Sequence, residues 1–384
     1  MKVAIVSTFR TMCGIAKYTE NLVNELSKLL ELKVFAEFPP SEDEPLDKNI
    51  KINFERCWRR YQGFEELEKK IIEYSPNIVH VQFVAGVYNE LFFQPNSPFQ
   101  KFLSNLRQKN IKIVLTLHDV PANWDNASQL FQWYKNLDAK FIGINSEMVK
   151  GLKNWYPQAD ATIIPIGSIY FKPYDKSKAR EILGLNENDF ILSQIGFYGA
   201  DKGMMEVIKS VPDITIPNFK LVFAGGFHPL TLPSHKSYVK DCIKTAIQLG
   251  IVNKVNFVGK ILSEEEINLW ASASDFLIIV KKSIFGYSGS ASVKRILWAE
   301  KPIIIGDDSE KLSEFEDGIN CVKTSTSIKD ISKKIMWLYN NEDIQKTIVE
   351  GALKYAKNTT FDIIAKNHIK LYKGVLNENE SMFN

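Results

Sequence analysis

Short apolar runs alternate with segments of helical period along almost the whole chain. The first apolar run, Lys2 to Ser7, has the continuous hydrophobicity of a strand buried on both faces of a parallel sheet. It is followed by apolar residues at three- to four-residue spacing from Ile15 to Leu30, which predict an amphipathic helix. Strands that alternate with helices in this way require right-handed crossovers. The sequence therefore predicts an α/β protein with Rossmann-like, doubly wound sheets.

The alternation falls into two series, which predicts two domains. A chain of 384 residues is long enough for two domains of roughly 150 residues each. A polar, proline-bearing stretch, Lys172 to Ser177, separates the series, and the boundary is placed at 170/171. The first series includes a strand over 52–54 and a helix over 127–137, and the second includes a helix over 292–299. Doubly wound domains in tandem are expected to leave a cleft between their strand C-termini, where such sheets bind ligands.

Composition excludes several classes of protein. The net charge of +3, with 45% hydrophobic and 24% charged residues, argues against a disordered chain and gives no reason to expect nucleic acid. The four cysteines form no CxxC pair, so neither a zinc cluster nor a dithiol motif is indicated. No signal sequence and no apolar run of about 18 residues is found. A cytoplasmic protein with reduced thiols is expected.

Two strand-to-helix turns are candidates for anion binding. In the stretch 286–292, GYSGSAS, small residues precede a predicted helix, which favours either a phosphate cradle or a flexible loop. In the stretch 196–203, GFYGADKG, Lys202 precedes another helix. A cation at that end of a helix is unfavourable without an anion. Lys202 is therefore either a ligand-binding residue or a solvated surface lysine.

Polar residues also stand at predicted strand ends. His118 and Asp119 follow the strand 111–117, and His80 and Gln82 share one face of the strand 77–83. His80 and Gln82 are expected either to be hydrogen-bonded inside the core or to line the cleft. A basic and aromatic cluster over 58–61, WRRY, is expected to be a solvated helix edge, with contact to a membrane or a polymeric acceptor as the alternative.

Several catalytic signatures are missing from the sequence. There is no GxSxG, HExxH or GKS/T sequence, so acyl-transfer, zinc-hydrolase and P-loop chemistry have no support. The first strand is followed by RTMCG rather than GxGxxG, which disfavours a nicotinamide dinucleotide site.

Taken in order, the remaining motifs resemble a known family, the retaining, nucleotide-sugar-dependent glycosyltransferases of the GT-B fold, and among them the group 1, or family 4, enzymes. The resemblance covers nearly all of the chain. The matching segments are Gly14–Tyr18, Leu117–Asp119, Ile164–Gly167, Gly196–Gly203, Phe223–Gly225, Phe257–Gly259, Glu300–Ile304, Asp317–Asn320 and the closing helix with Tyr372. The resemblance implies an N-terminal acceptor domain, 1–170, and a C-terminal donor domain, 171–359. A C-terminal helix, 360–384, is expected to cross back and complete the N-terminal domain.

The resemblance also implies roles for individual residues. His118 would hydrogen-bond the transferred sugar, and Lys202 would neutralise the β-phosphate as the glycosidic bond breaks. The other expected contacts are Gly14, Ser288, Gly289 and Ser290 at the diphosphate, Val258, Gly259 and Arg295 at the nucleoside, and His80, Gln82 and Asp119 at the sugar or acceptor. The resemblance implies a nucleoside diphosphate sugar as the donor, and it implies neither a metal nor a cofactor.

One departure from the family pattern bears on activity. Counted back from Pro302, the two glutamates of the usual E-x7-E signature fall on Tyr287 and Arg295. The guanidinium of Arg295 cannot accept hydrogen bonds from ribose hydroxyls. The expected function is sugar transfer from a nucleoside diphosphate to a hydroxyl acceptor, on a sugar, lipid-linked, polysaccharide or protein-glycan molecule. The alternatives are a nucleotide-sugar epimerase and a non-catalytic binding protein.

Overall fold

The computed structural model describes residues 1–39, 51–60, 62–90, 96–121, 134–135, 137–228, 233–282, 286–307 and 312–377. The helix predicted over 127–137 lies largely outside these residues, as do Tyr61 and the tail after Asn377. The chain divides into two compact units. Unit 1 comprises Met1–Gly167, Phe285–Gly289 and Phe361–Asn384, and unit 2 comprises Ser168–Ile284 and Ser290–Thr360.

Unit 1 is built on a parallel seven-stranded sheet. Its order is β3-β2-β1-β4-β5-β7-β8, so the chain reverses its direction across the sheet between β1 and β4. The continuous hydrophobicity of β1 and β4 is explained by their central places, since both strands are buried on both faces. The strands are β1 (Lys2–Ser7), β2 (Glu31–Glu37), β3 (Phe54–Trp58), β4 (Ile78–Phe83), β5 (Lys112–Leu117), β7 (Lys140–Gly143) and β8 (Ala161–Ile163).

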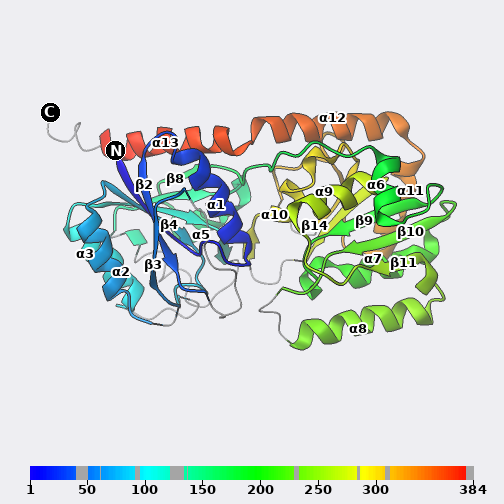
Figure 1. Ribbon diagram of the computed structural model, residues 1–384, viewed down its shortest axis with the longest axis horizontal. Helices are drawn as coiled ribbons and strands as arrows, with labels where there is room; N and C mark the ends of the chain where they lie inside the picture. Colours follow the sequence, from blue (N-terminus) through cyan, green and yellow to red (C-terminus); the bar gives the residue numbers. More distant parts are fainter. Residues whose placement is uncertain are drawn as a thin grey trace. The chain divides into compact units, whose positions relative to one another are not determined.

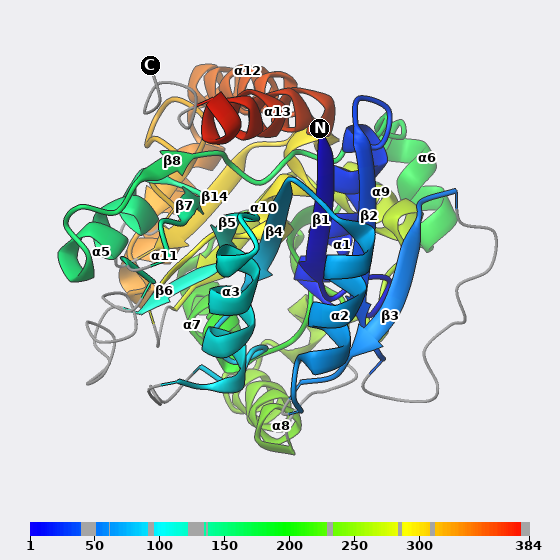
Figure 2. The same ribbon diagram turned by 90° about the vertical axis from the view of Figure 1, so that its left-hand side faces the viewer.

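The helices of unit 1 begin where the sequence supplies caps. Ser97 and Asn145 each accept a backbone N–H at the start of their helices, and the Sγ of Cys13 accepts from Ala16 in the same way. The helices are α1 (Gly14–Leu26), α2 (Glu65–Tyr74), α3 (Pro98–Gln108), α5 (Ser146–Trp155) and α13 (Phe361–Asn377). The last helix of the chain packs along α1, and Figures 1 and 2 show the red and blue helices side by side.

Unit 2 repeats the same topology with a parallel six-stranded sheet. Its order is β11-β10-β9-β12-β14-β15, with the reversal between β9 and β12. The strands are β9 (Phe190–Ile195), β10 (Phe219–Ala224), β11 (Val255–Phe257), β12 (Phe276–Lys281), β14 (Ile303–Asp307) and β15 (Val322–Thr324). The helices are α6 (Lys176–Leu183), α7 (Met204–Ser210), α8 (Pro233–Gln248), α9 (Glu264–Ala273), α10 (Ala291–Lys294), α11 (Ile328–Tyr339) and α12 (Glu342–Asn358).

Alternate residues of the unit 2 strands enter two separate cores, one on each face of the sheet. On β9, Leu192 packs with α7, α8 and α11, and its neighbour Ile191 packs with α9, α10 and α12. Both faces are thus covered by helices, as a parallel sheet requires. Figure 1 shows α7 and α8 on one side of this sheet and α9 on the other.

A two-stranded antiparallel ladder in unit 1 was not expected from the sequence. The backbone of β13 (Gly286–Ser288) pairs with β6 (Asp119–Pro121), which places Ser288 opposite Asp119. Within the stretch 286–292, residues 286–288 therefore form a strand rather than a loop. The ladder also explains why Phe285–Gly289, which interrupts unit 2 in the sequence, belongs to unit 1.

Two further element predictions need correction. The helix predicted over 292–299 is broken: α10 ends at Lys294, and a separate 3-10 turn, η4 (Leu297–Ala299), follows. The strand predicted over 52–54 begins at Phe54 and runs to Trp58, because its pairing with β2 starts at Phe54 opposite Val34.

Candidate functional site

The strand order indicates where each unit can bind a ligand. In an open parallel sheet, ligands bind at the carboxyl ends of the strands where the order reverses. In unit 1 these are the ends of β1 and β4. Gly14 begins the helix that follows β1, and Gln82 is the last residue but one of β4. In unit 2 they are the ends of β9 and β12, followed by the loop 196–203, which holds Lys202.

The structure joins three predicted residues of unit 1 directly. The Nε2 atom of His118 lies 2.9 Å from Gln82 Oε1, and Gln82 Nε2 lies 3.3 Å from the Nε2 atom of His80. His80 is fully buried, and its ring nitrogens also contact Thr116 Oγ1 at 2.7 Å and Tyr372 Oη at 2.6 Å. Of the two expectations for His80 and Gln82, the structure agrees with hydrogen bonding inside the core.

His118 lies at the edge of this cluster and is only partly buried. Its ring makes an edge contact with Tyr18 of α1 at 5.1 Å between centroids. Burial lowers the pKa of His118 to about 4, so the imidazole is neutral at pH 7. The next residue, Asp119, has its pKa raised by burial to about 6, despite a backbone hydrogen bond from Ala85 that lowers it.

Gly14 is the first residue of α1. A Cβ atom added there would meet no heavy atom within 4 Å. Packing within the protein therefore does not require glycine at this position. A side chain there would, however, obstruct a ligand that approaches the backbone.

The turn predicted to cradle a diphosphate is divided between the two units. Ser288 and Gly289 belong to unit 1, whereas Ser290 belongs to unit 2 and caps the four-residue helix α10 without a side-chain hydrogen bond. A Cβ on Gly289 would come within 2.9 Å of Ile166 and 3.0 Å of Ile144, so close packing in unit 1 already explains this glycine. Because α10 is so short, its dipole contributes little to anion binding.

Lys202 lies in a firmly anchored loop of unit 2. Gln194 donates its side-chain amide to Lys202 O at 2.7 Å, and Lys282 N donates to Asp201 O at 2.9 Å. Lys202 Nζ lies 2.7 Å from Asp201 Oδ2, and 35% of the Lys202 side chain and 41% of the Asp201 side chain are exposed. Since an exposed pair of this kind contributes roughly 0–1 kcal/mol, the ammonium group is available to an incoming phosphate.

Tyr198 links this loop to the predicted nucleoside contact, and sequence reasoning missed it. Its hydroxyl donates to Phe223 O at 2.8 Å and accepts from Gly259 N at 3.0 Å. Gly259 adopts φ +75°, a conformation that favours glycine. Val258 N donates to Phe223 O, so Val258 and Gly259 form a fixed turn after β11. The signal in the sequence was a tyrosine between two glycines at the end of β9.

Arg295 is paired rather than open to a phosphate. Its Nη2 and Nε atoms contact the Glu264 carboxylate at 2.5 and 3.3 Å. Glu264 is the first residue of α9 and lies five positions after Gly259. Arg295 replaces the second glutamate of the family signature. It thus binds a carboxylate from helix α9 of the same unit.

Only Arg59 is exposed in the described part of the basic cluster 58–61. Trp58 is 2% exposed and donates to Phe35 O. Arg60 makes a two-point contact with the buried carboxylate of Glu37 at 2.5 and 2.7 Å, and Arg59 lies over the ring of Phe38. Trp58 belongs to a strand, so the prediction of a solvated helix edge is wrong.

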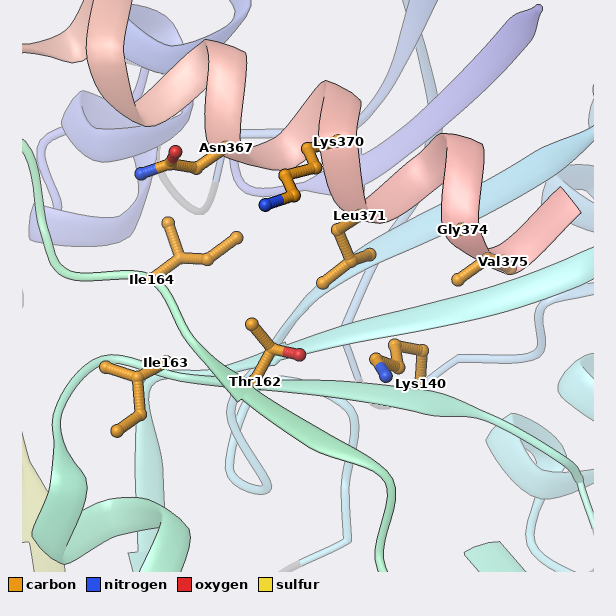
Figure 3. A pocket seen from close by; sticks show the side chains of 9 residues that line it. All are labelled: Lys140, Thr162, Ile163, Ile164, Asn367, Lys370, Leu371, Gly374 and Val375. Atoms are coloured by element: carbon orange, nitrogen blue, oxygen red, sulfur yellow. The ribbon is translucent and has the colours of Figure 1, made fainter. Parts of the chain in front are cut away.

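Unit 1 also has a cavity that contains none of the predicted site residues. It measures about 400 Å³ and lies between α13 and the edge strand β8, as Figure 3 shows. Lys140 and Lys370 are on its wall, but Lys140 is already paired with Asp160. Its place away from the strand reversal makes it a poor candidate for the reaction site.

The described residues offer neither a cluster of metal ligands nor a membrane-spanning helix. Those residues contain no cluster of three or more His, Cys, Asp or Glu side chains that could hold a metal ion. No helix within the described ranges is both long and apolar enough to cross a membrane.

Two Rossmann-like units with this strand order, and a final helix that returns to the first unit, define the class of the protein: it has the GT-B fold of glycosyltransferases. Residues 175–355 match the family of glycosyl transferases group 1, and this segment is a group 1 glycosyltransferase domain. The resemblance inferred from the sequence is thereby confirmed.

Individual relatives extend the similarity over nearly all of the chain. The uncharacterized glycosyltransferase MJ1178 of Methanocaldococcus jannaschii is 24% identical over 97% of this chain and 98% of its own. The crystal structure of Alr3699/HepE of Anabaena in complex with UDP superposes with a TM-score of 0.75 at 16% identity, covering 97% of this chain and 100% of that one. A structure of the same Anabaena protein with UDP-glucose gives a TM-score of 0.71, also at 16% identity and with the same coverage. A glycosyltransferase of Rickettsia africae gives 0.77 at 14% identity and 98% coverage of both chains.

Proposed function

We propose that this glycosyltransferase moves a hexose from a nucleoside diphosphate sugar to a hydroxyl acceptor, with retention of the anomeric configuration. The observation that carries the proposal is the position of Lys202, which lies inside the segment that matches the group 1 enzymes and in the loop that follows the central strand β9. The complexes of the Anabaena protein with UDP and UDP-glucose support a uridine nucleotide as the donor.

Unit 2 binds the donor in this proposal. The leaving group gains negative charge on its β-phosphate as the glycosidic bond breaks, and a fixed cation stabilises that charge. Lys202 supplies the cation from a loop held by Gln194 and Lys282. The base lies against Val258 and Gly259, whose backbone is fixed by Tyr198. Arg295 acts at the ribose as a pair with Glu264, whose carboxylate can accept hydrogen bonds from the ribose hydroxyls.

Unit 1 contributes groups that orient the sugar and the acceptor. His118 is neutral at pH 7, so it offers one N–H and one lone pair to hydroxyl groups rather than a charge. Gly14 leaves room for close approach to its backbone. Asp119, with a pKa of about 6, faces the acceptor and is mostly ionised at pH 7. His80 acts through Gln82 because it is fully buried.

The bond changes need no covalent intermediate with the protein. The acceptor oxygen attacks the anomeric carbon on the face that the diphosphate leaves, and the departing β-phosphate oxygen takes the acceptor's proton. One C–O bond forms, one C–O bond breaks, and the nucleoside diphosphate departs. Exclusion of water from the bound donor protects it from hydrolysis.

A direct test is to incubate the purified protein with a panel of nucleoside diphosphate hexoses and hydroxyl acceptors. Transfer is expected with a uridine donor, with the released UDP equal to the glycoside formed and the α-anomer retained. Conversion of the donor into a second nucleotide sugar without an acceptor would indicate an epimerase instead. Binding without release of UDP across the panel would contradict a transferase.

A further inference from the structure

A continuous hydrogen-bonded chain runs from the C-terminal helix of unit 1 to His118. Its members are Tyr372 on α13, His80 and Gln82 on β4, and His118 after β5. Tyr372 and His80 are both 0% exposed, and Gln82 is 1% exposed. Gln82 and Thr116 are partners in the β4–β5 register, so the alternating pattern puts His80, Gln82, Thr116 and His118 on one face of the sheet. A polar chain sealed from water in this way has fixed donors and acceptors.

Gln82 restricts the protonation of the two histidines because it contacts the same atom, Nε2, in both. One end of an amide accepts a hydrogen bond and the other end donates, whereas a neutral imidazole carries one N–H and one bare nitrogen. The two Nε2 atoms therefore cannot both be protonated or both be bare while the two contacts persist. The tautomer of His80 and the tautomer of His118 are complementary.

The observed orientation selects one arrangement. Gln82 Oε1 faces His118, so His118 donates from Nε2–H and has a bare Nδ1. Gln82 Nε2 faces His80, so the Nε2 atom of His80 is bare and accepts from Gln82 and from the Thr116 hydroxyl. His80 then carries its proton on Nδ1 and donates it to Tyr372 Oη. Every contact in the chain has one donor and one acceptor.

We infer that Tyr372, His80 and Gln82 are positioning residues that fix His118 as the Nε2–H tautomer, so that its Nδ1 accepts a hydrogen bond from a substrate hydroxyl. The inference rests on the proposed function only for the identity of that substrate. It adds a specificity: the sugar must present an O–H donor to His118, and a deoxy or fluoro group at that position loses the contact.

The test is a measurement of histidine tautomers in the ligand-free protein at pH 7. Long-range ¹H–¹⁵N correlation spectra of histidine-labelled protein distinguish Nδ1–H from Nε2–H, and single His substitutions assign the five rings. The wild type is expected to show His80 as Nδ1–H and His118 as Nε2–H. Both histidines in the same tautomer would overturn the inference.

Tyr372→Phe removes the acceptor of the His80 proton and leaves the ring in place. His80 is then expected to donate from Nε2 to Thr116, which turns the Gln82 amide and moves the His118 proton to Nδ1. A change at His80 without a change at His118 would contradict the coupling. Gln82→Met is expected to abolish the response of His118 to Tyr372→Phe.

Tyr18→Phe is the matched control. Tyr18 is also buried in unit 1 and touches His118, but among the described residues its hydroxyl has no hydrogen-bond partner. Both tautomers should stay as in the wild type, and a change equal to that of Tyr372→Phe would argue against the chain.

The activity readout is separate from the tautomer measurement. With an active donor and acceptor, Tyr372→Phe should lower kcat/KM about five- to tenfold, as expected for one misaligned hydrogen bond. If no sugar is transferred by the wild type, the proposed function fails while the tautomers still decide this inference. If transfer proceeds but the tautomers are uncoupled, only this inference fails.

Discussion

Arg295 holds Glu264 through two nitrogens, at 2.5 and 3.3 Å. The guanidinium is therefore already neutralised by a carboxylate of the same unit, and about a quarter of the Arg295 side chain remains exposed. Arg295→Gln should weaken binding of UDP less than threefold, because little free positive charge is lost. Arg295→Glu should lower the stability of unit 2 by about 1 kcal/mol or more, since two carboxylates would then face each other. Calorimetric titration with UDP and urea unfolding measure the two effects. A loss of UDP affinity greater than tenfold in Arg295→Gln would make Arg295 a phosphate ligand.

Lys202→Ala should lower turnover at least a hundredfold, which is the usual effect of removing one group that stabilises the leaving charge. Its effect on the free energy of unfolding should stay within about 0.5 kcal/mol, because Lys202 pairs only with the exposed Asp201 among the described groups. Initial rates and urea unfolding test both parts.

Lys178→Ala is the control for Lys202→Ala, since Lys178 is an exposed lysine of the same unit that pairs with Glu181. It should change neither turnover nor stability. If Lys202→Ala loses stability in proportion to activity, Lys202 has only a structural role.

Gly14→Ala separates ligand approach from folding. The Cβ atom meets nothing within 4 Å, so the substitution should leave the protein as stable or up to about 1 kcal/mol more stable. The affinity for the donor should fall about tenfold if the ligand approaches the Gly14 backbone. Gly374→Ala in α13, where a Cβ also meets nothing, should change neither donor affinity nor turnover. Unchanged donor affinity in Gly14→Ala would remove Gly14 from the site.

Lys294→Met should destabilise unit 2 by about 3–5 kcal/mol, because it leaves a buried carboxylate without its cation. Lys294 is 1% exposed, and its Nζ atom lies 3.0 Å from Glu314, 2.6 Å from the Tyr355 hydroxyl and 4.3 Å from the centre of the Phe315 ring. Adding Glu314→Gln should recover a large part of the loss. Thermal unfolding of the single and double variants checks this, and equal destabilisation in both would rule out the charge argument.

Stability should fall as the pH drops from about 6.5 to 4, because buried neutral histidines must become charged. Burial lowers the pKa of His368 from 6.5 to about 4, so its proton binds more readily to the unfolded chain in that range. The loss attributable to His368 is at most about 3 kcal/mol. Urea unfolding at pH 7 and pH 5 should show a smaller difference for His368→Gln than for the wild type. An equal difference would exclude His368 as a source of acid sensitivity.

Asp119 should act with the opposite sign. Burial raises the pKa of its carboxyl from 3.8 to about 6, so the unfolded chain releases this proton first and the folded state loses stability as the pH rises from about 4 to 6. Asp119→Asn should therefore stabilise the protein at pH 7, by at most about 3 kcal/mol, and have little effect at pH 4. Stabilisation that does not depend on pH would have another cause.

Local patterns in the sequence predicted the fold well because periodicity and helix caps are local properties. Continuous apolar runs marked the central strands β1 and β9, and Ser97 marked the start of α3. Contacts between distant residues were not predictable in the same way. Ser288 lies opposite Asp119, 169 positions earlier in the chain, and no feature of either segment specifies the other.

The same distinction between local patterns and distant contacts applies to the candidate site. Its residue types and strand-end positions followed from the sequence, but the partner of each polar group did not. His80 and Tyr372 are 292 positions apart, and Arg295 and Glu264 are 31 apart. Whether a histidine is buried or exposed, and whether an arginine is paired or open, depends on these distant neighbours.

The route of the chain through unit 1 limits how the protein can be divided. The polypeptide leaves this unit after Gly167, returns for Phe285–Gly289, leaves again, and ends in it with α13. A fragment that stops at Gly167 would lack both the β13 partner of β6 and the helix that covers α1. No single cut in the backbone therefore yields two complete halves, and translation must pass α13 before the first unit can acquire this helix.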